Sequence, residues 1–286
     1  MNQQHKIPPQ PRYIQIETVL GCDAECPFCP QKRIDRTPAV MSEAIWKKII
    51  GDTRGLGITY RPFLQNEALI DKRLARIVEH IKEDPTARAE INTNGNLLDE
   101  RRGRELIEAG IDLVRFSIDA FSPETFAQCR VGLDYARVVD NVNRFIALAR
   151  ERGGRVTTEV RMIDMETNRH EQEAFVEYWG ARADRALIVP LYRWPWDEGV
   201  EMVSKPCLKM REEMFFYTDG RAVLCCWDIA GRAVIGDVAR ESVLDIWNGA
   251  VRRAYATNLS RGERDKIPLC SRCDAYKDRR FEGFPD

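Results

Sequence analysis

The sequence predicts an α/β fold, a partial (β/α)6 TIM-like barrel followed by a small C-terminal domain built from a β-hairpin plus a helix. Two observations predict it. Strand-like and helix-like stretches alternate as far as Trp196, which is typical of parallel strands joined by crossover helices. Beyond Trp196 the alternation stops, helical periodicity is scarce, and five of the nine cysteines follow.

The barrel elements are predicted from apolar runs and from the residues that bound them. Strands are expected at 13–19, 60–65, 88–93, 113–118, 156–163 and 186–191, and helices at 42–50, 72–83, 99–109, 135–150 and 171–179. Ser42 is suited to cap the first helix, Pro85 ends the second, and Gly110 ends the third. Six units are too few for the closed eight-unit barrel, so we expect an open one with active groups at the carboxyl ends of its strands.

A hairpin is predicted beyond the barrel, at 215–224. Its Asp219-Gly220 turn lies between two apolar runs, which is a strong short-range hairpin signal. The sequence therefore divides into an N-terminal extension at 1–12, the barrel at 13–196 and the small domain at 197–286.

Composition excludes several classes of function. The chain has 286 residues, a hydrophobic fraction of 44% and a formal net charge of −1, which gives no electrostatic case for bulk nucleic-acid or anionic-membrane binding. No signal-peptide pattern opens the chain and no apolar run reaches the roughly 20 residues of a membrane span. We expect a cytoplasmic protein, where cysteines serve metal or catalytic roles more often than disulfides.

Three cysteines follow the first strand within eight residues: Cys22, Cys26 and Cys29. Thiolate sulfur selects iron–sulfur clusters, zinc or copper(I). A cubane cluster held by three protein ligands keeps one iron open for another molecule. Zinc would need a fourth ligand, and His5 in a proline-rich leader is a poor one. A disulfide framework is disfavoured because an odd local count cannot close on itself.

This Cys-x3-Cys-x2-Cys run, with Phe28 before its last cysteine, resembles the signature of the radical S-adenosylmethionine (SAM) enzymes. The resemblance implies that the open iron chelates SAM and that the reduced cluster splits SAM to a 5′-deoxyadenosyl radical. It also implies six SAM contacts: Phe28, Glu67, Asn94, Ser117, Arg130 and Leu191. Glu67 would meet the SAM ammonium, but it lies in Gln-Asn-Glu-Ala where the family commonly has Gly-Gly-Glu-Pro. Asn94 and Ser117 lie at strand ends like the family's, and Arg130 would hold the SAM carboxylate.

A second cysteine set lies in the C-terminal part: Cys207, Cys225, Cys270 and Cys273. Four thiolates satisfy either a structural zinc ion or a fully ligated 4Fe–4S cluster, and the spacing alone does not separate them. With Trp247 between hairpin and Cys-x2-Cys pair, the set resembles the shortened SPASM domain called Twitch. That resemblance implies one auxiliary 4Fe–4S cluster, and therefore two clusters in all.

Cys226 directly follows Cys225 and is the candidate catalytic residue. It is either a small buried cysteine or the donor of a hydrogen atom to a substrate radical, in which case a carbon would be inverted. Cys129 is the rival donor. If neither donates, the auxiliary cluster can accept an electron, and the result is dehydrogenation of an alcohol to a ketone. The resemblance to Twitch enzymes of aminoglycosides and aminocyclitols favours epimerisation of a carbinol carbon in antibiotic biosynthesis.

We expect a small polar substrate, because only about a dozen residues precede the barrel whereas many peptide-modifying relatives carry a leader-binding domain there. Acidic and aromatic side chains would suit an amino sugar. The candidate substrate contacts are Glu17, Arg161, Asp164, Arg193, Trp227 and Asp228. The resemblance further implies a flavodoxin or ferredoxin-type reductant. The alternatives are a peptide-modifying maturase and, outside enzymes, a zinc-binding scaffold.

Overall fold

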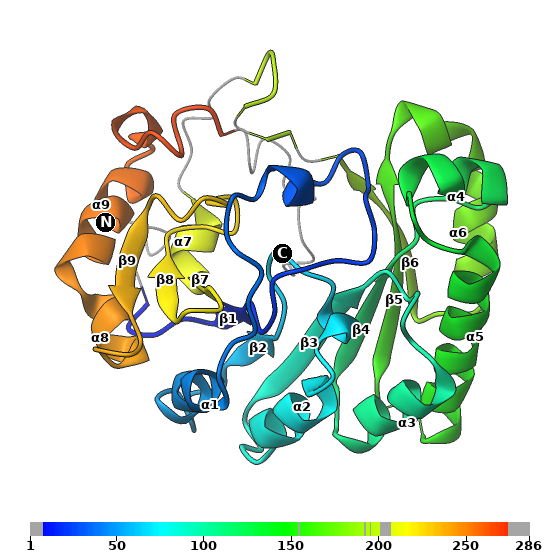
Figure 1. Ribbon diagram of the computed structural model, residues 1–286, viewed down its shortest axis with the longest axis horizontal. Coiled ribbons are helices and arrows are strands. Elements are labelled where there is room, and N and C mark those ends of the chain that lie inside the picture. Colours follow the sequence, from blue (N-terminus) through cyan, green and yellow to red (C-terminus); the bar gives the residue numbers. More distant parts are fainter. Residues whose placement is uncertain (1–7, 154, 192, 195, 201–206, 274–286) are drawn as a thin grey trace.

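The computed structural model describes residues 8–153, 155–191, 193–194, 196–200 and 207–273 (Figure 1). Its centre is a nine-stranded sheet in the order β6-β5-β4-β3-β2-β1-β7-β8-β9. Neighbouring strands are parallel from β6 through β1 to β7, and the last two pairs are antiparallel. The predicted α/β class with an open, six-unit parallel barrel is confirmed.

The strands span Tyr13–Ile16 (β1), Thr59–Arg61 (β2), Arg88–Thr93 (β3), Leu113–Ser117 (β4), Thr157–Asp164 (β5), Arg185–Pro190 (β6), Glu213–Phe216 (β7), Arg221–Val223 (β8) and Val234–Asp237 (β9). All six predicted barrel strands are present. β2 is the most shortened: it ends at Arg61, because Pro62 has no amide hydrogen to continue the ladder.

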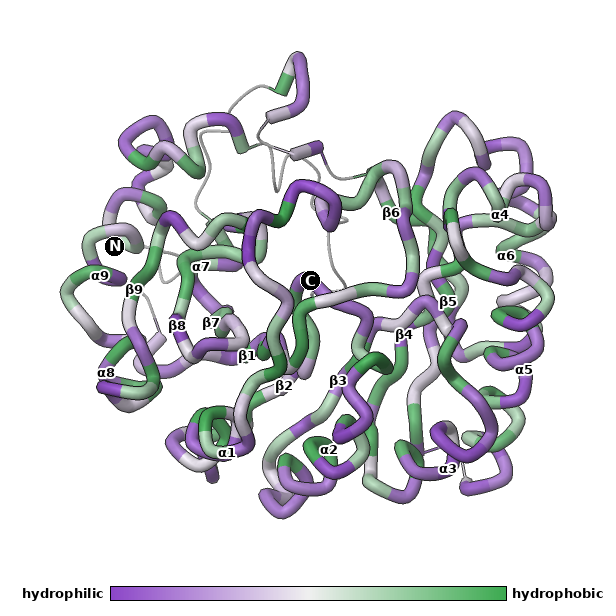
Figure 2. Tube along the Cα trace, in the orientation of Figure 1, coloured by the Kyte–Doolittle hydropathy of each residue, from purple (hydrophilic) through white to green (hydrophobic). Residues whose placement is uncertain are grey.

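The helices span Glu43–Gly51 (α1), Leu74–Lys82 (α2), Glu100–Glu108 (α3), Pro123–Cys129 (α4), Tyr135–Glu151 (α5), Gln172–Gly180 (α6), Leu208–Glu212 (α7), Val243–Asn248 (α8) and Ala250–Ser260 (α9). Ser42 caps α1 as predicted, its side chain accepting from the amide of Ile45. α2, α3 and α5 cover the outer face of the sheet, and hydropathy alternates along them as in amphipathic helices (Figure 2). No helix of the described residues is long and apolar enough to cross a membrane.

The C-terminal part differs from the expectation in two ways. The hairpin forms as β7 and β8, but β7 also pairs in parallel with β1, so the hairpin extends the barrel sheet. The domain also contains more helix than the single helix predicted beside the hairpin, since α7 precedes β7, and α8 and α9 follow β9. The apolar pattern of α9 is weak because its buried side includes Arg252, whose guanidinium lies 3.2 Å from the Trp247 ring centre.

Candidate active site

The N-terminal cysteines lie in the loop between β1 and the 3-10 helix η2 (Pro30–Arg33). Cys26 is buried, and its carbonyl accepts from the amide of Cys29 at 3.1 Å, which turns the loop back on itself. The sulfur of Cys22 accepts from the amide of Ala24 at 3.5 Å. Burial raises the pKa of the Cys22 thiol to about 12, so a thiolate here needs a bound cation. The donor set fits an iron–sulfur cluster that stabilises all three thiolates.

A polar network holds this loop against the ends of β2 and β3. Asp23, inside the cysteine motif, accepts from the side-chain amides of Asn94 at 2.7 Å and Asn96 at 2.8 Å. Glu67 is buried and accepts from the hydroxyl of Thr93 at 2.6 Å and from the backbone amide of Asn94 at 2.8 Å. Two of the residues predicted to contact SAM, Glu67 and Asn94, therefore also position the cysteine loop.

The stability of the fold should respond to the titration of Glu67. Burial raises the pKa of this carboxyl from 4.5 to about 7, so its ionisation opposes folding increasingly as pH rises from 4.5 to 7. Glu67→Gln removes this titration. We expect the free energy of unfolding of the variant, relative to the unsubstituted chain, to rise by about 1 kcal/mol between pH 6 and pH 8 in urea melts. Glu79→Gln, at an exposed carboxylate, is the control. If the free energy of unfolding of Glu67→Gln differed from that of the unsubstituted chain by the same amount at pH 6 and pH 8, the raised pKa of Glu67 would be contradicted.

Arg130 lies directly against the cysteine loop. One terminal nitrogen contacts the sulfur of Cys26 at 3.5 Å, and the guanidinium carbon lies 5.5 Å from the Phe28 ring centre. Its other partner is Asp119, a buried carboxylate whose residue has a φ of +62°, a strained backbone for a residue with a side chain. The structure thus gathers Phe28, Arg130 and the cysteines at one end of the barrel, although Arg130 is already paired within the protein.

A cavity of roughly 290 Å³ opens beside the cysteine loop, over the interior of the barrel. It brings together residues from the loop, from β5 and the end of β6, and from the hairpin. The predicted site residues that line it are Phe28, Cys29, Arg161, Leu191, Cys226 and Trp227. Ser117, at the end of β4, is half-buried but is not among the lining residues.

Four of the predicted substrate contacts lie outside this cavity. Glu17 is buried and forms a two-pronged ion pair with Arg36, at 2.6 and 2.7 Å. Asp164 is paired with Arg169 at the surface, and Arg193 is exposed, donating to backbone carbonyls nearby. Asp228 is also buried, and its carboxylate closes a turn by accepting from two backbone amides at 2.9 and 2.7 Å. The predicted acids therefore do not line this cavity, although Asp228 borders a neighbouring one of roughly 800 Å³, and their contact with a substrate stays a prediction.

The C-terminal cysteines line one small cavity of their own. Cys207, Cys225, Cys270 and Cys273 all border it, and Arg264 donates to the sulfur of Cys273 at 3.3 Å. Burial raises the pKa of Cys207 and Cys270, so these thiolates also require a bound cation. Trp227 lines both this cavity and the larger one. Four cysteines around one cavity are the donor set that a fully ligated 4Fe–4S cluster requires.

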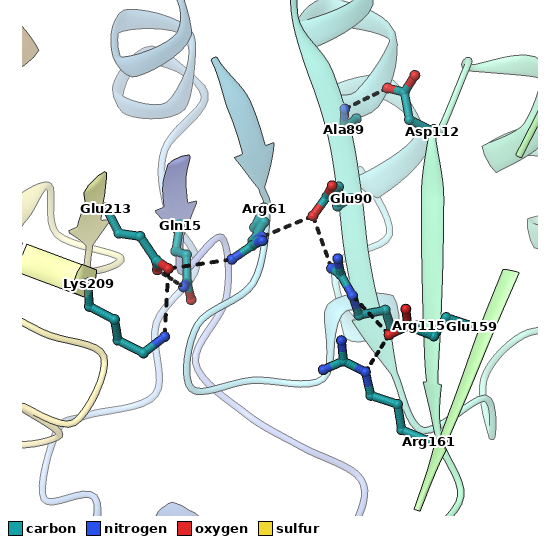
Figure 3. A network of polar contacts seen from close by, with 10 residues as sticks. All are labelled: Gln15, Arg61, Ala89, Glu90, Asp112, Arg115, Glu159, Arg161, Lys209 and Glu213. Carbon is teal, nitrogen blue, oxygen red and sulfur yellow. Dashed lines mark hydrogen bonds and ion pairs between the residues drawn. The ribbon is translucent and has the colours of Figure 1, made fainter. Parts of the chain in front are cut away.

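The sequence analysis did not predict that charged side chains on the inward face of the strands belong to the site (Figure 3). Arg61, Arg115 and Lys209 line the cavity beside the cysteine loop, and their ion-pair partners are Glu90, Glu159 and Glu213. A signal existed: charged residues recur at alternate positions of strands that are otherwise apolar, as in Glu159-Val160-Arg161.

Comparison with solved structures finds the same fold. BtrN in complex with AdoMet and 2-DOIA matches with a TM-score of 0.67 at 19% identity, covering 93% of each chain. Streptococcus suis SuiB bound to precursor peptide SuiA matches with a TM-score of 0.71 at 13% identity, covering 94% of this chain and 73% of that one. Both likenesses concern the fold alone.

Comparison with curated sequences finds relatives of the barrel. A probable GTP 3′,8-cyclase of Methanococcus maripaludis (strain C7) is 26% identical over 168 residues, which are 58% of this chain and 54% of the relative. A GTP 3′,8-cyclase of Limosilactobacillus fermentum is 29% identical over 140 residues, 48% of this chain and 42% of the relative. The chain thus spans about half the length of the curated relatives it matches.

Two family models match. The iron–sulfur cluster-binding domain SPASM covers residues 207–274, and the radical SAM superfamily covers residues 16–177. The SPASM match implies an auxiliary iron–sulfur cluster, and the radical SAM match implies SAM with a 4Fe–4S cluster. Both matches confirm the predicted cofactors. The radical SAM match spans more than half of the chain, and the chain belongs to the radical SAM superfamily.

Proposed function

We propose that the chain abstracts a hydrogen atom from a carbinol carbon of a small polar substrate and returns hydrogen to the other face from Cys226, which epimerises that carbon. When bound, the N-terminal cluster and SAM supply the 5′-deoxyadenosyl radical. One observation carries the proposal: Cys226 lines the same cavity as Cys29, so a thiol and the cysteine loop border one space. SAM would be held by Glu67, Asn94, Ser117 and Arg130, with Phe28 and Leu191 beside its adenine.

A hydrogen bond from the segment after β2 restrains the backbone at Cys226, which follows the hairpin. The carbonyl of Cys226 accepts from the side-chain amide of Gln65, which follows β2, and its thiol is half-buried beside that of Cys225. Donation of hydrogen from sulfur to carbon produces a thiyl radical, which needs one electron and one proton to return to the thiol. Cys225, a proposed ligand of the auxiliary cluster, is the adjacent residue, so a cluster held there would supply the electron, and solvent would supply the proton.

The second candidate is dehydrogenation of the alcohol to a ketone. Trp227 lies between the two cavities and borders both, which favours passage of an electron from the substrate radical to the auxiliary cluster. The fold shared with BtrN, solved with 2-DOIA, supports it, and the fold shared with SuiB, solved with a precursor peptide, supports the more distant peptide-modifying alternative. A flavodoxin or ferredoxin-type protein in a reducing cytoplasm would supply the first electron to either enzyme.

Cys226→Ala separates the first two candidates. In deuterium oxide, the unsubstituted enzyme should release an epimer with one solvent-derived deuterium, because a thiol hydrogen exchanges with solvent. The variant should still cleave SAM but form at least tenfold less epimer, since alanine has no hydrogen to donate. Mass spectrometry of product and 5′-deoxyadenosine measures both.

The matched control is Cys129→Ala, at the buried cysteine that ends α4, away from the lining of the cavity. A Cys226→Ala enzyme that epimerises at the normal rate would remove Cys226 as donor. A ketone that forms equally in all three proteins, with two hydrogens lost, would favour dehydrogenation.

A further inference from the structure

We infer that the substrate carries an oxyanion, a carboxylate or a phosphate, and that Arg161 binds it. The inference names the substrate class of the cavity and rests on the proposed function only in taking that cavity as the substrate site. It replaces the amino sugar that the sequence suggested. The acids on which that suggestion depended are Glu17, Asp164 and Asp228, and all three are engaged elsewhere.

The wall of the cavity is cationic. Arg61 from β2, Arg115 from β4, Arg161 from β5 and Lys209 from α7 all line it. Among the described residues, no aspartate or glutamate belongs to the lining; its other polar members include Gln15, Gln65 and Asn92. A wall of this kind attracts anions and repels a polyamine.

The carboxylates that balance these cations are buried behind the wall. Glu90 pairs with Arg61 at 3.1 Å and with Arg115 at 3.0 Å. Glu159 contacts Arg115 at 3.3 Å and also accepts from the Nε of Arg161. The side chain of Glu159 is 2% exposed, so it does not compete for a ligand in the cavity. The pairing restrains the guanidinium groups of Arg61 and Arg115, whose side chains still line the cavity.

Arg161 is the cation best placed to bind a ligand. Its contact with Glu159 uses Nε alone, at the edge of the group nearest the strand. In the part of the chain that the structure describes, neither terminal nitrogen of Arg161 has a hydrogen-bond partner. Figure 3 shows the guanidinium at the end of the network, with these nitrogens away from Glu159. Two parallel donors at the end of a fixed guanidinium match the two oxygens of a carboxylate or phosphate.

A second group in the cavity also lacks a partner. The side-chain oxygen of Asn92, on β3 opposite Arg115, is buried without a hydrogen bond among the described residues. An acceptor in this state costs free energy unless a ligand donates to it. A substrate hydroxyl supplies such a donor. The cavity therefore offers an anion-binding end at Arg161 and a hydroxyl acceptor at Asn92, as a hydroxylated acid or a sugar phosphate requires.

The test is equilibrium binding without turnover. The cluster-reconstituted, SAM-loaded and unreduced enzyme is titrated calorimetrically with three probes on one hexose scaffold: D-glucuronate, glucose 6-phosphate and D-glucosamine. We expect at least one anion to bind tenfold or more tightly than glucosamine. Preference for glucuronate identifies a carboxylate site, and preference for glucose 6-phosphate a phosphate site. If neither anion exceeds glucosamine, the inference is overturned.

Three variants assign the binding to Arg161. Arg161→Gln should weaken binding of the preferred anion at least tenfold. Arg161→Lys should recover part of this lost affinity because the positive charge remains. Arg185→Gln is the matched control, since Arg185 also faces Glu159, at 3.6 Å, but is exposed and outside the cavity lining. SAM affinity should be unchanged in all three. If Arg161→Gln lowered the affinity for SAM as much as the affinity for the anion, Arg161 would bind the SAM carboxylate and the inference would fail.

The two hypotheses fail in different experiments. Binding of the probes needs no radical, so an enzyme that binds an anion but never forms 5′-deoxyadenosine contradicts the proposed function alone. An enzyme that cleaves SAM but shows no preference for anions contradicts this inference alone.

Discussion

We expect Cys26→Ala to abolish the formation of 5′-deoxyadenosine and to lower the iron content of the reconstituted chain from about eight to about four atoms. Cys26 is the buried member of its motif, and its sulfur contacts the guanidinium of Arg130. Without this proposed ligand, two thiolates would remain for a cubane that needs three, while the four C-terminal cysteines would keep their own set. Iron analysis and chromatography of an anaerobic mixture with dithionite and SAM measure both effects.

Cys129→Ala provides the control for Cys26→Ala. Cys129 is also buried and lies next in sequence to Arg130, but it belongs to α4 and to neither cysteine set. This variant should keep both clusters and its 5′-deoxyadenosine. If Cys26→Ala retained its full iron content, or if both variants lost the same amount, the three-cysteine assignment would be wrong.

The barrel could be predicted because local patterns and tertiary structure agree there. β3 was placed at its observed bounds, since a stretch of alternating polar and apolar residues ends at Asn94-Gly95, and Gly95 takes a φ of +78° that favours glycine. The continuation of the sheet through β7 could not be predicted. Pairing of Gln15 with Phe215 joins segments 200 residues apart, and no local pattern reports which strand lies beside β1.

The role of the cysteines could be predicted from the sequence, whereas the surroundings of the acids could not. Spacing within one loop is a local property, so Cys22, Cys26 and Cys29 are recognisable without a fold. The place of Glu17 depends on Arg36, whose guanidinium also stacks 3.6 Å from the centre of the Tyr217 ring in the hairpin. A carboxylate near a strand end looks the same in sequence whether it faces a cavity or a buried arginine. The local cysteine pattern therefore predicts the cofactors, whereas the surroundings of the acids could not be predicted from the sequence.

Glu90→Ala should lower the free energy of unfolding by about 3–5 kcal/mol. Glu90 lies on β3 between Arg61 of β2 and Arg115 of β4, and accepts a hydrogen bond from each. Although burial opposes ionisation, the charges of Arg115 and Arg61 together lower the pKa of Glu90, so the carboxylate is charged in the fold. Alanine leaves two guanidinium groups in the barrel with no carboxylate between them. Urea unfolding of the reconstituted chain measures the loss.

The size of this effect depends on burial, and a surface pair provides the comparison. Glu83 pairs with Arg54 at 2.8 Å, but its side chain is 55% exposed and water screens the pair, so Glu83→Ala should destabilise the chain far less than Glu90→Ala. Because the pKa of Glu90 is lower in the folded chain than in the unfolded one, its contribution is complete above the unfolded pKa and disappears as pH falls through the folded one. The gap between Glu90→Ala and the unsubstituted chain should therefore narrow on acidification. Equal losses for Glu83→Ala and Glu90→Ala at neutral pH would show that water screens the interior network, and the fixed orientation of Arg115 in the cavity would lose its physical basis.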